Sequence, residues 1–248
     1  MTAPLVLLSD FGLSDAYVGV MKGVIQILSP DIPVIDLCHH INPQNINHAR
    51  AVLMDNINYF NDDAIFCCIV DPGVGSSRKA LAVASKDRIL IGPDNGLFSD
   101  FITNGNVFEL PSKKGISMTF HGRDIFAPWA AKLASNRSEL SNLKTLDMDS
   151  LTLLPLLNLT LNKSWQNLDI LYHDHFGNQI TNAIVTQRNI EVRMQGQTLP
   201  VCSHYSELPE NTLGAIIGSS NRIELSIKNG NAALNSTKTT LIQARYIS

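Results

Sequence analysis

Residues 64–75, AIFCCIVDPGVG, join an unbroken apolar run to an aspartate and a glycine-rich turn. Residues 5–12, LVLLSDFG, follow the same pattern, and so do residues 89–96, ILIGPDNG. Short runs that are apolar at every position are typical of strands buried on both faces of a sheet. The carboxyl ends of such strands form the ligand crevice of an open α/β sheet. The three runs therefore predict an acid-lined pocket that suits a ligand with hydroxyl groups or positive charge.

The composition of the 248-residue chain is that of a folded protein, since 44% of the residues are hydrophobic and 17% are charged. A net charge of −3 and the lack of a basic run disfavour a nucleic-acid partner held by phosphate contacts. No apolar stretch approaches the roughly 20 residues that a membrane span needs. The first residues also lack the pattern of a secretory signal. We therefore expect a cytoplasmic protein without a membrane partner.

Cysteine and histidine spacing gives little support for a metal site. The four cysteines include no C-x-x-C pair. Cys67 and Cys68 are neighbours in an apolar run, so we expect them to point to opposite faces of a strand and to belong to the core. His173 and His175 share a strand face but have no third ligand at a useful spacing. We expect neither a metal nor another cofactor.

Residues 1–150 alternate between strand-like and helix-like patterns, which predicts a layered α/β domain with a mainly parallel sheet. Apolar residues three and four positions apart predict a helix over residues 15–28. Asn45 can cap a second helix that extends to about residue 60. A third helix is predicted over residues 124–134, with Pro128 in its first turn. Further strands are expected at residues 34–37, 81–84, 88–91 and 107–110.

The pattern changes near Ser150. Residues 151–164 are rich in leucine without helical spacing and contain Pro155, so we assign them to a linker. Residues 165–248 contain short β-type runs separated by turn residues, and helical periodicity almost vanishes. This half predicts a smaller all-β domain, a sandwich or a barrel. A pocket between two domains is a natural ligand site.

Two segments of the first domain could carry chemistry. Residues 71–78, DPGVGSSR, begin with Asp71 and end with Arg78, although a tight turn alone explains this motif about equally well. The segment is not a phosphate loop, because no Lys-Ser/Thr pair follows the glycines. His121 lies directly before a predicted helix, where an ordinary surface histidine is, on this local pattern alone, more expected than a catalytic one.

Three segments of the second domain contain polar candidates. Asp174 and Asn178 flank a Phe-Gly pair, a composition that an ordinary turn also has. Ser219 belongs to a polar turn before a strand. Glu224 interrupts an apolar strand pattern, and a carboxylate that faces inward there needs a partner.

Seven segments taken together resemble the S-adenosylmethionine hydroxide adenosyltransferases, the adenosine-forming S-adenosylmethionine hydrolases related to fluorinase and chlorinase. The resemblance runs from Leu7 to about Ala233 and rests on the order and spacing of SDFGLSDAYVGVMKGVI, DLCHHINPQNI, VDPGVGSSR, IGPDNGL, TFHGRDIFAP, DHFGNQITN and IELSIKNGNAA. It implies an N-terminal α/β domain, a C-terminal β-barrel and a homotrimer with active sites between subunits. The implied substrate is S-adenosyl-L-methionine, and the implied products are adenosine and L-methionine.

The resemblance also implies two groups of site residues. The catalytic group would handle the attacking water and consists of Asp71, Arg78 and His121. The substrate-binding group consists of Asp10 at the ribose hydroxyls, Asp174 at the methionine amine, Asn178 at the adenine, Ser219 at the methionine carboxylate and Glu224 near the ligand. Asn221 stands where the family usually has glycine, and asparagine tolerates the left-handed backbone that such a turn requires.

The same resemblance favours hydrolysis over halogenation. Halogenating relatives carry tyrosine where this chain has Asp71 and His121, and Gly122 stands where fluorinase has a halide-binding serine. The expected reaction is in-line attack of water on the ribose C5′, with either Asp71 or His121 accepting the proton and Arg78 stabilising developing hydroxide. Two alternatives stay open: a slow halide-dependent halogenase, and a non-catalytic protein that binds adenosine or S-adenosylmethionine.

Overall fold

The computed structural model describes residues 3–86, 88–103, 105–235 and 240–247. The chain divides into two compact units, Met1–Pro155 and Leu156–Ser248. The division lies inside residues 151–164, the segment predicted to be a linker. Two residues of that segment, Leu159–Thr160, form a short strand of the second unit.

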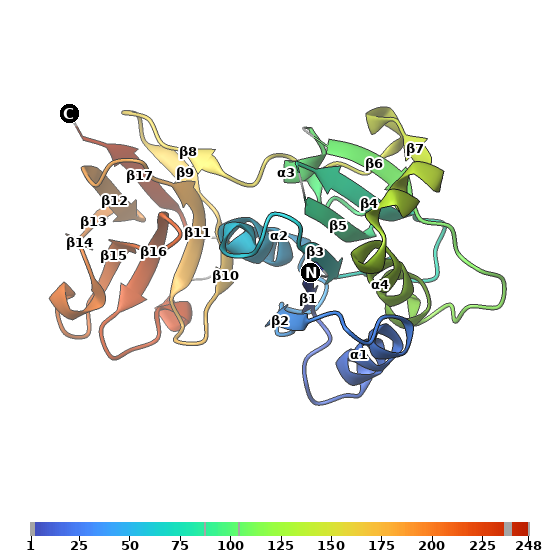
Figure 1. Ribbon diagram of the computed structural model, residues 1–248. Coiled ribbons are helices and arrows are strands. Elements are labelled where there is room, and N and C mark those ends of the chain that lie inside the picture. The colour runs from blue at the N-terminus through green and yellow to red at the C-terminus, as the bar shows by residue number, and fades with distance from the viewer. Residues whose placement is uncertain (1–2, 87, 104, 236–239, 248) are drawn as a thin grey trace. The chain divides into compact units, whose positions relative to one another are not determined.

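Unit 1 is a seven-stranded sheet with helices on both faces (Figure 1). The strand order is β2-β1-β3-β5-β4-β6-β7. The strands are β1 (Leu5–Ser9), β2 (Val34–Cys38), β3 (Ile65–Ile69), β4 (Ala80–Ser85), β5 (Arg88–Pro93), β6 (Gly105–Glu109) and β7 (Lys144–Leu146). The α-helices are α1 (Tyr17–Leu28), α2 (Ile46–Asn56), α3 (Ser99–Ile102) and α4 (Ala127–Ser135). Shorter helical turns are η1 (Ile57–Tyr59), η2 (Gly122–Phe126), η3 (Arg137–Asn142) and η4 (Met148–Ser150).

The predicted α/β architecture is confirmed, but the sheet is mixed and not mainly parallel. Strand β1 pairs in parallel with β2 and β3, and β3 pairs in parallel with β5. The pairs β4–β5, β4–β6 and β6–β7 are antiparallel. The physical reason lies in the connection from Ser85 to Arg88, which is too short for the crossover that a parallel pair needs.

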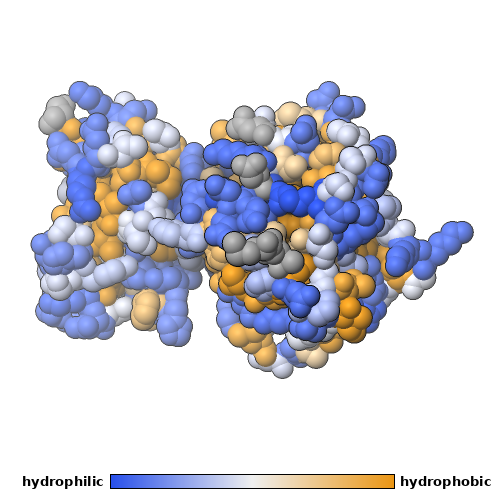
Figure 2. Space-filling view, viewed as in Figure 1, coloured by the Kyte–Doolittle hydropathy of each residue, from blue (hydrophilic) through white to orange (hydrophobic). Residues whose placement is uncertain are grey.

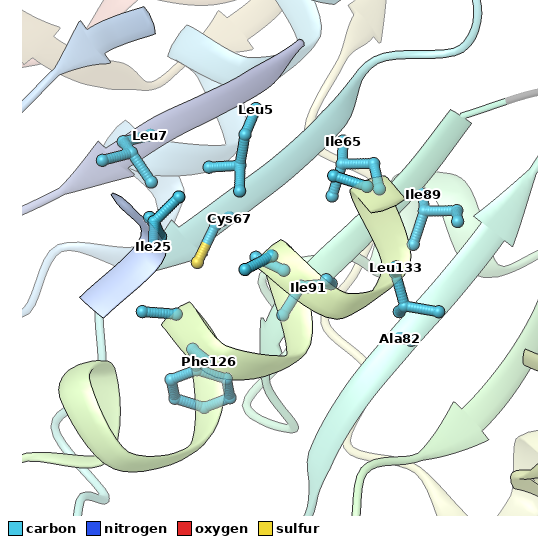
Figure 3. Close-up of a cluster of buried hydrophobic side chains, with 14 of the residues drawn as sticks. Leu5, Leu7, Ile25, Ile65, Cys67, Ala82, Ile89, Ile91, Phe126 and Leu133 are labelled. Atoms are coloured by element: carbon cyan, nitrogen blue, oxygen red, sulfur yellow. The ribbon is translucent and has the colours of Figure 1, made fainter. Parts of the chain in front are cut away.

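Both faces of the sheet are buried, because β1 and β3 are buried at every position. Helices α1 and α4 cover one face, where Figure 3 shows Ile25, Phe126 and Leu133 packed with Leu5, Leu7, Ile65 and Cys67. Helices α2 and α3 cover the other, where Leu53 and Ile102 pack with Val6, Leu8, Phe66 and Cys68. Cys67 and Cys68 thus point to opposite faces, as expected, and burial raises the pKa of both thiols.

The helix boundaries follow local chemistry. Asn45 caps α2 as predicted, since its side-chain oxygen accepts a hydrogen bond from the backbone N–H of His48 at 3.0 Å. The helix predicted to begin at residue 124 begins earlier. A π-helical turn, η2, comes first and leads directly into α4, which carries Pro128 in its first turn.

Unit 2 consists of two β-sheets that share one hydrophobic core, which confirms the predicted β domain. Its strands are β8 (Leu159–Thr160), β9 (Gln166–Leu168), β10 (Ile170–His173), β11 (Gln179–Ile184), β12 (Ile190–Met194), β13 (Gln197–Leu199), β14 (Val201–Cys202), β15 (Leu213–Ile217), β16 (Arg222–Ile227) and β17 (Ile242–Tyr246), with helical turns η5 (Tyr205–Glu207) and η6 (Ala232–Asn235). The larger sheet has the order β10-β11-β16-β15-β14, with β8 paired to β11, and the smaller one has the order β13-β12-β17-β9. Ala215 and Leu225 of the larger sheet belong to the same cluster as Val192 and Ala244 of the smaller one.

Within the described residues, no helix is both long and apolar enough to cross a membrane. Figure 2 shows hydrophilic areas on both units, with hydrophobic areas among them. The described part of the chain also contains no group of three or more His, Cys, Asp and Glu side chains that could hold a metal ion.

Candidate active site

A cavity of about 280 Å³ lies in unit 1 where β1 and β3 end. Asp10 follows β1 and Asp71 comes two residues after β3. Because these strands pair in parallel with Ser9 opposite Ile69, their ends meet at one edge and both aspartates line the cavity. The remaining lining residues include Phe11, Tyr17, Phe120 and His121.

Asp94, the third aspartate predicted at a strand end, lies outside this cavity and binds backbone. It is buried and does not line this cavity. Its Oδ1 accepts a hydrogen bond from the backbone N–H of Thr152 at 2.9 Å, which fixes the end of unit 1. The acid-lined pocket therefore contains two of the three predicted aspartates.

Arg78 links Asp71 to His121, so the structure brings the three predicted catalytic residues together. Its Nε donates to Asp71 Oδ1 at 2.9 Å, and its Nη2 donates to Asp71 Oδ2. The same Nη2 donates to His121 Nδ1 at 2.8 Å. The side chains of Arg78 and Asp71 are only 9% and 5% exposed. A bidentate pair with so little solvent contact holds both groups in a fixed orientation.

The contact with Arg78 assigns the protons of His121. A guanidinium can only donate, so Nδ1 of His121 must accept, and the neutral ring then carries its hydrogen on Nε2. Burial, and next the positive charge of Arg78, lower the pKa of His121 below its ordinary value of 6.5. Nε2 is buried and has no hydrogen-bond partner among the described residues. The Nε2–H of His121 is therefore a buried donor that no described residue accepts.

Three aromatic rings form one wall of the cavity. The ring centroid of Phe120 lies 5.1 Å from that of Tyr17 and 6.1 Å from that of Phe11, and both pairs have edge-to-face geometry. Gly122 lies beneath this cluster, and a Cβ atom there would come within 3.1 Å of the Phe120 ring and 3.2 Å of the Met21 sulfur. A side chain at position 122 thus requires the aromatic wall to move.

A second set of predicted residues comes together in unit 2, around the turn between β10 and β11. Asp174 Oδ1 accepts from the backbone N–H groups of Phe176 and Asn178, at 2.9 and 2.8 Å. Asp174 Oδ2 accepts from the side-chain amide of Asn178 at 2.8 Å. Asp174 and Asn178 also line a cavity of about 720 Å³ within this unit.

Tyr205 connects this turn to Glu224. The Tyr205 hydroxyl donates to Glu224 Oε2 at 2.7 Å and accepts from the Asn178 amide at 3.4 Å. Glu224 is buried, and Tyr205 is a partner of the kind that a carboxylate in an apolar strand requires. Burial, and then the bond to Glu224, raise the pKa of Tyr205. Sequence reasoning missed Tyr205, because it lies in the short turn η5 with no periodic pattern around it.

Ser219 is exposed in the turn between β15 and β16. That turn is closed by hydrogen bonds from Gly218 N to Arg222 O at 2.9 Å and from Asn221 N to Gly218 O at 3.0 Å. Asn221 has a φ of 61°, the left-handed conformation that asparagine was expected to tolerate. Glu224 packs directly beneath the turn, against Gly218.

Both halves of the chain match one family. Residues 5–144 match the SAM hydroxide adenosyltransferase N-terminal domain, and residues 168–237 match the C-terminal domain of that family. The chain belongs to the SAM hydroxide adenosyltransferase family. The resemblance drawn from the sequence motifs is thereby confirmed.

Individual relatives agree with the family assignment. The chain is 34% identical over 243 residues to an (R)-S-adenosyl-L-methionine hydrolase of Thermus thermophilus, covering 92% of this chain and 93% of the relative. It is 25% identical over 158 residues to a fluorinase of Nocardia brasiliensis, covering 52% of this chain and 53% of the relative. The solved structure of an uncharacterized conserved protein from Thermotoga maritima superposes with a TM-score of 0.83 at 28% identity. The match covers 97% of this chain and 99% of that one.

The close packing at Gly218 gives the first prediction. A Cβ atom at Gly218 would lie 1.7 Å from Glu224 Oε1, so Gly218→Ala should displace the buried carboxylate and break its bond to Tyr205. We expect a loss of about 1–3 kcal/mol in the free energy of unfolding, measured by thermal or urea denaturation.

The matched control is Gly19→Ala in α1, where a Cβ atom would meet nothing within 4 Å. This variant should be as stable as the parent protein or more stable by up to about 1 kcal/mol, because alanine is the better helix former. Unchanged stability of Gly218→Ala would contradict the described packing of Glu224.

Proposed function

We propose that this protein hydrolyses S-adenosyl-L-methionine to adenosine and L-methionine. Two findings support this proposal: the family membership, and the 34% identity to a relative that is named an (R)-S-adenosyl-L-methionine hydrolase. The observation that carries it is the position of Asp71, Arg78 and His121, which are joined by one guanidinium beside a cavity. Such a cluster suits the activation of a small nucleophile.

The leaving group needs no help from an acid. The sulfur of the substrate is a sulfonium cation, and it becomes neutral when the C5′–S bond breaks and its electron pair stays on the sulfur. The difficult part is the nucleophile, because water attacks carbon well only as it loses a proton. The new bond joins the water oxygen to C5′, and the proton must pass to a group of the protein.

The hydrogen bonds of His121 suggest how this work is divided. Its Nδ1 is already bonded to Arg78, so its free group is the Nε2–H donor, which can orient the water oxygen. Asp71 keeps unshared electron pairs beside its two bonds to Arg78 and accepts the proton. The positive charge of Arg78 stabilises the developing hydroxide. General base assistance of this kind supplies about 10²–10⁴-fold in rate.

Positioning adds to this effect. Water and C5′ held at near-attack distance contribute about 7 kcal/mol or more to lowering the barrier. We assign Asp10 to the ribose hydroxyls, Asp174 to the methionine amine, Asn178 to the adenine and Ser219 to the methionine carboxylate. Glu224 acts on this set through Tyr205, to which its carboxylate is bonded.

We also propose that the active protein is a homotrimer with active sites at the subunit interfaces. The proposed residues are divided between the two units of the chain, which fits a site completed by a neighbouring subunit. The purified protein should therefore have three times the chain mass of 27.2 kDa in light scattering or analytical ultracentrifugation. A monomer that retains full activity would contradict this assembly.

The reaction itself can be tested by direct product analysis. Purified protein incubated with S-adenosyl-L-methionine in halide-free buffer should release adenosine and L-methionine in equal amounts. Chloride added to the same assay should yield no 5′-chloro-5′-deoxyadenosine. A halogenated nucleoside would favour the halogenase alternative, and tight binding by calorimetry without any product would favour the non-catalytic one.

Two substitutions test the division of work within the catalytic group. Asp71→Asn should lower kcat by about 10²–10⁴-fold, because the proton acceptor is lost. His121→Gln should retain more activity, since the amide can accept from Arg78 and still donate to water. Asp94→Asn is the matched control, because its oxygen still accepts from Thr152 and it lies outside the cavity lining. A greater loss in His121→Gln than in Asp71→Asn would reverse the assignment.

The pH profile follows from the lowered pKa of His121. The neutral ring is required, because protonation of Nδ1 would remove the acceptor for Arg78. Since burial and Arg78 lower this pKa below 6.5, the neutral form persists as the pH falls past 6.5. We expect kcat/KM to stay constant through pH 6.5 and to decline only at lower pH. A decline centred above pH 6.5 would contradict this role.

A further inference from the structure

A chain of hydrogen bonds in unit 1 begins at the surface and ends beneath the loop that carries Asp10. Lys22 Nζ donates to Asp36 Oδ2 at 2.6 Å, and Asp36 Oδ1 lies 3.1 Å from His39 Nε2. His39 Nδ1 lies 2.7 Å from the hydroxyl of Ser9. Lys22 and Asp36 are about 40% exposed, whereas Ser9 and His39 are buried. The chain therefore runs from an ion pair in contact with water to a buried serine.

The chemistry of the groups fixes the direction of these bonds. Asp36 is held as a carboxylate, because the hydrogen bonds from Lys22 and His39 outweigh the opposing effect of burial and lower its pKa. With a neutral ring, His39 donates to it from Nε2–H, which leaves Nδ1 as an acceptor for the Ser9 hydroxyl. The oxygen of Ser9 in turn accepts from the backbone N–H of Phe11 at 3.3 Å. Every link has one donor and one acceptor.

Serine, histidine and aspartate are the residue types of a hydrolytic triad, but burial excludes that role here. Ser9 is 2% exposed and does not belong to the lining of the cavity next to it. Its hydroxyl hydrogen points to His39 and its oxygen accepts from Phe11, so no substrate carbonyl could reach it. The arrangement is therefore suited to holding backbone in place.

The backbone that it holds belongs to the cavity. Asp10 and Phe11 line the cavity, and they directly follow Ser9. His39 supports this loop twice, because its ring bonds to Ser9 and its carbonyl accepts from Gly12 N at 2.7 Å. The segment after His39 also reaches the loop, since Gln44 N donates to Asp10 Oδ2 at 2.8 Å. Loss of the His39 ring would loosen the loop at its centre.

We propose that His39, fixed by Asp36 and Lys22, is a positioning residue that sets the Asp10 carboxylate for recognition of the ribose diol. This inference rests on the proposed function, in which Asp10 binds the ribose hydroxyls. His39 touches neither the ligand nor the reacting atoms, so its effect reaches the substrate through Ser9 and Asp10. Residues outside the cavity lining thus contribute to discrimination between ribose and deoxyribose.

The test compares binding of adenosine with binding of 2′,3′-dideoxyadenosine by calorimetry. His39→Gln and Ser9→Ala should each weaken the binding of adenosine by about tenfold, the loss that corresponds to one well-oriented hydrogen bond. The affinity for the dideoxy analogue should stay nearly unchanged. His40→Gln is the matched control, since the neighbouring histidine is exposed. It should bind both nucleosides like the parent protein.

A double-mutant cycle separates positioning from a general structural effect. In an Asp10→Ala background, His39→Gln should cost nothing further in adenosine binding, because the group that it positions is gone. Additive losses would overturn the proposal. Thermal unfolding of each variant, followed in parallel, shows whether the protein is folded under the assay conditions.

A ligand-independent measurement keeps the proposal testable even if a variant binds poorly. Backbone amide exchange at Phe11 and Gly12 should be faster in His39→Gln and Ser9→Ala, but not in His40→Gln. Unchanged exchange at these two amides would overturn the inference. If His39→Gln loses the discrimination that the parent protein shows, but the parent does not hydrolyse S-adenosylmethionine, the proposed function fails and the positioning role stands. If it hydrolyses the substrate and His39→Gln discriminates equally well, only the positioning role fails.

Discussion

The guanidinium of Arg78 is the constraint on which the candidate site depends. A charge that is almost removed from water is costly unless it is paired and hydrogen-bonded, and Asp71 supplies both oxygens for this purpose. Nη2 of Arg78, which donates to Asp71, also donates to Nδ1 of His121. Asp71 follows β3, Arg78 precedes β4 and His121 precedes η2, so the cluster forms only after these three segments have packed.

This pairing also determines the charge that the cavity offers to a ligand. Among the residues that line it, Asp10 and Asp71 are the acids, and Arg78 balances the charge of Asp71. The negative potential therefore comes mainly from Asp10, while the aromatic rings of Phe11, Tyr17 and Phe120 give the cavity an apolar wall. A cationic sulfonium next to a ribose matches both properties.

Much of this arrangement could be predicted from the sequence, because its determinants are local. The apolar runs before Asp10 and Asp71 predict buried strands, and parallel pairing of β1 with β3 brings their ends together. Asn45 is recognisable as a helix cap because the capping group and the helix are adjacent. The position of β4 was less accessible, since its place between β5 and β6 depends on pairing with β6, a strand that follows later in the chain.

The partners of buried polar groups could not be predicted, because they come from distant segments. Tyr205 reaches Glu224 across 19 positions, and Asp94 binds the backbone of Thr152 across 58. No spacing rule connects such residues. The proton on His121 is a similar case, since it follows from the contact with Arg78 and not from the histidine's own neighbours in the sequence.

The π-helical turn η2 makes the site sensitive to chain length. Its closing hydrogen bond runs from Ala127 N to Gly122 O, which accommodates one residue more than an α-helical turn does. Removal of a single residue from Gly122–Phe126 would restore ordinary helix geometry and rotate the preceding residues by about 100° around the axis of α4. His121 would then turn away from Arg78. The length of this segment therefore matters to the site independently of the side chains that it carries.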